Sequence, residues 1–70
     1  MDNRDTLKQL RDCIRSAYPT DREEISLVRQ LGTLEGILST LMATNTEVKD
    51  TVHMMLEYYQ EMNALRKEKE

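Results

Sequence analysis

The sequence has few of the residues that build turns, disulfides or aromatic cores. Its 70 residues include two Gly, one Pro, one Cys and three Tyr, with no Phe or Trp. One Cys cannot form an intrachain disulfide, and three Gly and Pro residues cannot supply the turns of a β-sandwich or barrel. The sequence also lacks the Gly-rich loop that binds a nucleotide in a βαβ unit. A small all-α protein is the fold class that remains.

Size and charge narrow the possibilities further. A core in a chain this short rarely contributes more than about 3–5 kcal/mol, so association with a second chain is a common remedy. The net charge of −3 argues against a DNA-binding surface that covers the whole domain. The longest uncharged stretch, residues 36–46, is far shorter than the roughly 20 residues that cross a bilayer, and residues 1–5 lack the apolar run that is typical of a secretory signal. We therefore expect a cytoplasmic protein without a membrane partner, which also suits a lone free Cys.

Apolar spacing predicts three helices in one domain of residues 1–70. The first is expected over about residues 4–17, with Asp2 or Asn3 as its N-cap. It should end at Tyr18, because a residue before proline is pushed out of the helical conformation. Its apolar stripe consists of Leu7, Leu10, Ile14 and Ala17.

The second and third helices are expected over about residues 21–43 and 47–67. Thr20 and Glu23 match a capping box at the start of the second helix. The second helix carries a leucine stripe that is predicted to be buried, formed by Leu27, Leu31, Leu34, Leu38 and Leu41. The third helix carries a stripe formed by Val48, Val52, Met55, Tyr59 and Met62. The charged tail, residues 66–70, is expected to fray.

The junction at residues 44–46 leaves two topologies open. In the first, the second and third helices form an antiparallel hairpin, and Thr44 with Glu47 makes another capping box. In the second, one helix runs from about residue 21 to 67 as a parallel coiled coil, with Asn45 at an inward position that fixes the register. The apolar face is wider than a coiled-coil seam, which favours the hairpin within a small bundle.

A charge-poor segment of the second helix carries the first candidate binding surface. Between Gln30 and Thr46 only Glu35 is charged. Small residues lie opposite the leucine stripe there, and such residues allow another helix to approach closely. The predicted interface with a second copy or a partner consists of Gly32, Gly36, Ser39, Ala43, Ile37 and Met42.

A basic stripe on the first helix is the second candidate surface. It consists of Arg4, Lys8, Arg11 and Arg15. These side chains could contact phosphates or an acidic protein partner. Asp5 and Asp12 lie within one helical turn of Lys8 and Arg15, so pairing within the helix would leave a solvated face instead. No aromatic residue lies among the basic ones to stack on bases, which makes nucleic acid the less favoured partner.

Catalytic and metal-binding groups are scarce. His53 is the only histidine, and Asp50 and Glu57 share its predicted helix face, which is expected to be solvated rather than metal-binding. Cys13 is expected to be a partly buried small apolar residue. The sequence therefore predicts no enzyme activity and no cofactor.

The sequence predicts a small non-enzymatic protein–protein interaction module, such as an adaptor, an inhibitor or a chaperone-like accessory protein. It is expected to act as a helical homodimer that also binds an unidentified protein. Two alternatives stay open: a nucleic-acid-associated dimer that uses the basic stripe, and a purely structural coiled coil.

Overall fold

The computed structural model describes residues 2–69, with side chains described to residue 67, and this part of the chain contains four α-helices and no strand. The helices are α1 (Asn3–Ala17), α2 (Arg22–Thr33), α3 (Glu35–Thr44) and α4 (Thr46–Lys69). The predicted all-α class is confirmed. The predicted count of three helices is wrong, because the second predicted helix is divided into α2 and α3.

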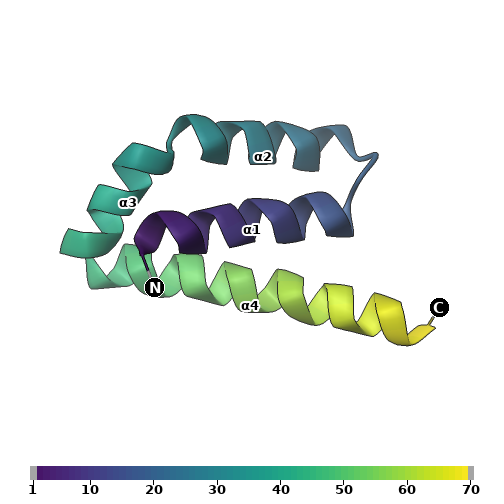
Figure 1. The fold of residues 1–70 in the computed structure, drawn as a ribbon. Helices are drawn as coiled ribbons and strands as arrows, with labels where there is room; N and C mark the ends of the chain where they lie inside the picture. Colours follow the sequence, from purple (N-terminus) through teal and green to yellow (C-terminus); the bar gives the residue numbers. More distant parts are fainter. Residues whose placement is uncertain (1, 70) are drawn as a thin grey trace.

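Helix α1 lies between α2 and α4 (Figure 1). Helix α2 runs back along α1, α3 closes the end near the N-terminus, and α4 runs in the same direction as α1. In the described part of the chain, no Cα atom of α2 lies within 8 Å of one in α4. The expected hairpin of the second and third predicted helices is therefore not confirmed: of the second predicted helix, only the part that forms α3 contacts α4. Helices α2 and α4 both pack on α1, and α3 lies between them in the sequence.

The break between α2 and α3 is at Leu34. Its backbone has φ −96° and ψ 6°, and its side chain caps neither helix. Gly32 and Gly36 flank the break, and each costs about 1 kcal/mol relative to Ala inside a helix. The Thr33 hydroxyl also donates to the Arg29 carbonyl at 3.1 Å, a local bond that tends to bend helices.

A second break at Asn45 excludes the continuous helix over residues 21–67. Asn45 has extended backbone angles, φ −131° and ψ 108°. Its side-chain Oδ1 accepts from the backbone N–H of Val48 at 3.2 Å, so Asn45 caps the start of α4. The predicted cap, Thr44, instead donates its hydroxyl to the Thr40 carbonyl within α3.

At the start of α2, as at the start of α4, the cap lies one residue after the predicted one. Asp21, not Thr20, is the N-cap, and its Oδ1 accepts from the backbone N–H groups of Glu23 and Glu24 at 2.9 and 3.2 Å. A carboxylate at this position also interacts favourably with the positive end of the helix dipole, which a threonine hydroxyl does not. The predicted N-cap of the first helix, Asp2, is confirmed by its bond from Arg4 N–H.

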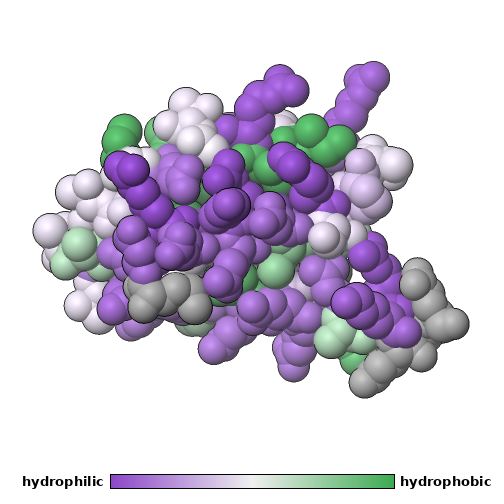
Figure 2. All heavy atoms as spheres, in the orientation of Figure 1, coloured by the Kyte–Doolittle hydropathy of each residue, from purple (hydrophilic) through white to green (hydrophobic). Residues whose placement is uncertain are grey.

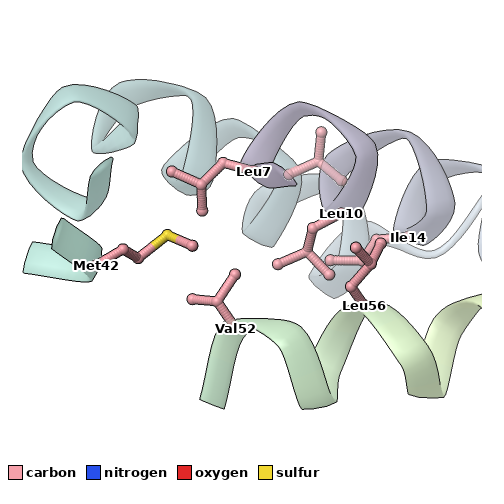
Figure 3. Close-up of a cluster of buried hydrophobic side chains, with 7 residues drawn as sticks. Leu7, Leu10, Ile14, Met42, Val52 and Leu56 are labelled. Atoms are coloured by element: carbon pink, nitrogen blue, oxygen red, sulfur yellow. The ribbon is translucent and has the colours of Figure 1, made fainter. Parts of the chain in front are cut away.

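The core is built around α1. Leu7, Leu10 and Ile14 have no exposed surface. In Figure 3 their side chains point toward residues of α4, with Met42 of α3 at one end of the cluster. The buried apolar set comprises Leu7, Leu10, Ile14, Val28, Met42, Val52 and Leu56.

Polar side chains of α4 hold the C-terminal end of α1. Asn63 Nδ2 donates to the Cys13 carbonyl, and Arg66 Nη1 donates to the Ala17 carbonyl, each at 3.1 Å. The Ala17 carbonyl is among the last four of α1, which have no donor within the helix, so Arg66 satisfies one of them. Helix α4 continues to Lys69, so the expected fraying is not seen at residues 66–69, and Glu70 lies outside the described residues.

Candidate functional site

Two grooves with no lining residue in common lie on the surface of the bundle. The first, between α1 and α2, has a volume of about 440 Å³ and is lined by Arg11, Arg15, Ile25, Val28, Arg29, Gly32 and Thr33. The second has a volume of about 380 Å³ and is lined by Leu10, Leu31, Leu38, Glu47, Val48, Thr51, Val52 and Met55. We call them the arginine groove and the apolar groove.

The two surfaces predicted from the sequence meet in the arginine groove. A Cβ atom placed on Gly32 would lie 3.1 Å from Nη1 of Arg11, so the glycine of α2 makes room for the guanidinium of α1. Arg11 Nη2 also lies 3.4 Å from Glu35 Oε2 at the start of α3. The small-residue side of α2 therefore seats an arginine of its own chain.

The other residues of the predicted interface fall into different environments. Met42 is buried in the core with 2% of its surface exposed, so a single chain offers little of it to a partner. Gly36 is exposed, with Arg4 Nη2 3.9 Å from the position of a Cβ atom. The Ser39 carbonyl accepts from Asn3 Nδ2 at 3.3 Å. Ile37 is 62% exposed, and Ala43 is also exposed.

The basic stripe of α1 is only partly paired. Arg11 with Glu35 is the one ion pair among the described residues, so the expected pairing of Lys8 and Arg15 with neighbouring aspartates is not seen. Arg4, Lys8 and Arg15 are exposed. Figure 2 shows hydrophilic residues across the middle of the molecule, where α1 lies in Figure 1. The sequence did not single out Arg29, which α2 adds to the stripe; it lies on the side of α2 that faces Arg11 and Arg15.

Two leucines of the predicted stripe, Leu31 and Leu38, line the apolar groove. Leu10 of α1 is part of its lining, together with leucines from α2 and α3 and apolar residues of α4. The stripe is not fully buried: Leu27, Leu31 and Leu38 are half-buried. Leu34 and Leu41 are 43% and 40% exposed. The prediction of a buried leucine face is thus only partly met within one chain.

Two tyrosines follow Met55 along α4 and form a cluster of aromatic rings with a third from the end of α1. The rings of Tyr58 and Tyr59 lie edge to face at 5.2 Å, and Tyr18 meets Tyr59 in the same way at 6.2 Å. Burial, followed by the negative charge of Glu24 on α2, raises the pKa of Tyr59 above its usual value. The Tyr18 hydroxyl donates to the Met62 sulfur at 3.4 Å.

The described residues contain no group of three His, Cys, Asp or Glu side chains that could hold a metal ion. Burial, and then the neighbouring Asp12, raise the pKa of the half-buried Cys13 thiol. A raised pKa lowers the fraction of reactive thiolate at neutral pH. None of the helices described here combines the length and apolar character needed to cross a membrane.

Comparisons with other proteins find no match for this chain, whether among family models, curated proteins or solved structures. Its function is therefore inferred from its own residues and the two grooves.

Proposed function

We propose that this protein is a non-enzymatic interaction module that works as a homodimer, with the apolar groove covered by a second copy. The supporting observation is the half-covered leucine stripe, which lies beside a groove whose only charged lining residue is Glu47. A stripe of five leucines in a soluble helix normally faces a core. In a single chain, this leucine face is only partly covered.

The exposed surface area of the chain is consistent with a face that a second copy covers. A compact monomer of 8.2 kDa is expected to expose about 4,500 Å². This chain exposes 5267 Å², an excess of roughly 700 Å² over that expectation. A stable interface of standard size buries about 800 Å² on each partner. The excess is therefore close to what one side of a dimer interface would cover.

The chain itself carries the surface needed to fill the groove. Ile37, Leu34 and Leu41 are exposed on α3 and at its start, and Leu38 of the same helix lines the groove. A ridge beside a complementary groove allows two copies to cover each other about a two-fold axis. An amphipathic helix from another protein would fill the groove, but it would leave the ridge of Leu34, Ile37 and Leu41 exposed. These features favour self-association.

Sedimentation equilibrium or light scattering of the purified chain tests the proposal. We expect twice the chain mass of 8.2 kDa at micromolar concentration. Val48→Glu should return the mass to that of one chain, because it places a carboxylate in the groove. Val48 is the third residue of α4, where an acidic residue suits the helix dipole, so the helix itself should persist.

Met54→Glu is the matched control. It adds the same charge to the same helix at a side chain that is 69% exposed and does not line the groove. This variant should remain dimeric, and circular dichroism should show equal helicity for both variants. A parent chain that is monomeric across the concentration range would refute the proposal. A Val48→Glu variant that is fully helical and still dimeric would refute the assigned surface.

A further inference from the structure

Three arginine side chains from two helices line the arginine groove. Arg11 and Arg15 come from successive turns of α1, and Arg29 comes from α2. No acidic residue lines the groove. Like charges gathered in one concave site raise the local potential and attract an anion. This groove shares no lining residue with the apolar groove, so covering the apolar groove does not by itself fill it.

The charge of the site matches a doubly charged anion. The three guanidinium groups carry three positive charges, and Glu35 beside Arg11 cancels one of them. A phosphomonoester carries a charge of about −1.5 to −2 at pH 7. A single carboxylate or a phosphodiester carries one negative charge and would leave one guanidinium unmatched. Arginine also binds phosphate oxygens through two parallel hydrogen bonds.

Arg11 is held in place before any ligand arrives. Gly32 accommodates its guanidinium, and Glu35 holds Nη2 at 3.4 Å. Its Nε is buried and has no hydrogen-bond partner, so this side chain has donors that the described part of the chain does not satisfy. Arg15 and Arg29 are exposed and free to close on a ligand. A site with one fixed and two mobile cations loses less conformational entropy on binding than three mobile ones.

The lining also indicates what the phosphate is attached to. Ile25 and Val28 supply an apolar wall next to the arginines, and the volume of about 440 Å³ exceeds that of a phosphate group alone. We propose that the arginine groove binds a phosphomonoester, carried either by a small molecule with an apolar body or by a phosphorylated side chain of a protein.

Titration of the intact chain with phenyl phosphate, followed by the backbone amide resonances of Gly32 and Thr33, tests this proposal. We expect saturable shifts at both amides and weaker binding of phenyl sulfate, which has a similar shape but one negative charge. A short phosphoserine peptide forms a second arm, and the tighter of the two phosphomonoesters identifies the source. No saturable shift with either phosphomonoester, or equal affinity for phenyl sulfate, would overturn the proposal.

Charge-matched variants locate the site. Arg15→Gln and Arg29→Gln should each raise the dissociation constant about tenfold, the effect of losing one hydrogen bond to a charged group. Lys49→Gln on α4 removes the same charge far from the groove and should leave the constant unchanged. Equal effects of all three variants would show non-specific attraction and refute the site. Salt-sensitive binding of duplex DNA without binding of either phosphomonoester would also refute it.

Discussion

Replacing Gly32 with Ala should stabilise the protein less than the same change at Gly36. Alanine is favoured over glycine in a helix by about 0.8–1.0 kcal/mol. At Gly36 the nearest side-chain atom to a new methyl group is Arg4 Nη2 at 3.9 Å, an ordinary contact, so most of this gain should appear. At Gly32 the methyl group would meet Arg11 Nη1 at 3.1 Å, which is too close for an unstrained contact.

The loss at Gly32 can be bounded from the structure. The end of the Arg11 side chain must move by a few tenths of an ångström, which disturbs its 3.4 Å pair with Glu35. The two side chains are 25% and 28% exposed, and partly exposed pairs of this kind contribute about 0–1 kcal/mol. We therefore expect Gly32→Ala to change the free energy of unfolding by less than about 0.5 kcal/mol, against about 0.8 kcal/mol for Gly36→Ala.

Urea denaturation at one fixed protein concentration measures both changes, because dimerisation would make stability concentration-dependent. The decisive comparison is a double-mutant cycle with Arg11→Gln. Once the guanidinium is removed, Gly32→Ala should yield the full gain of about 0.8 kcal/mol. If Gly32→Ala stabilised the parent and the Arg11→Gln variant equally, Arg11 would not lie against Gly32, and the arrangement of the arginine groove would be wrong.

Three further predictions concern single side chains. Asn45→Ala should lower the free energy of unfolding by about 1 kcal/mol, because α4 loses its cap, whereas Thr44→Ala should be nearly neutral in the same urea titration. Burial and Glu24 raise the pKa of Tyr59 above its ordinary value of 10.0, so its contribution to stability is full below pH 10 and is lost as the pH rises through the raised value. Tyr59→Phe should therefore show a shallower loss of stability between pH 9 and 11, and an unchanged slope would contradict the assignment. Cys13 should react with iodoacetamide at pH 8 more slowly than free cysteine and regain the normal rate in urea; equal rates in the folded chain would count against its burial.

The sequence was most informative where several local signals agreed. Helix α1 was predicted within one residue at its start, because its apolar spacing, the cap at Asp2 and the stop before Pro19 all agree. Caps were less well predicted where two candidates were adjacent. At Thr20–Asp21 and Thr44–Asn45 the pattern of a capping box favoured the threonine, but the acidic or amide side chain caps in both places.

The spacing of apolar residues could not predict the break at Leu34. It also could not predict which face of α2 packs on α1. The leucine spacing continues through Leu34 as if the helix were unbroken, and the flanking glycines, which could have signalled the break, were assigned to an interface instead. The small and bulky sides of α2 were both recognised. Which of them α1 would contact depends on how close the helices approach, and Gly32 permits the closer approach that brings Arg11 across α2. Of the leucine side, Leu31 and Leu38 are left lining the apolar groove.

The central place of α1 also bears on how the chain folds. Its carbonyls at Cys13 and Ala17 are engaged by α4 side chains 50 and 49 residues further along the sequence. Helical proteins usually fold quickly because most of their contacts are local, and long loops must close before distant contacts can form. On a ribosome, α1 emerges first but is enclosed only after α4 has been made. We therefore expect this small helical protein to fold more slowly than its helix content suggests, with the docking of its last helix as the slow step.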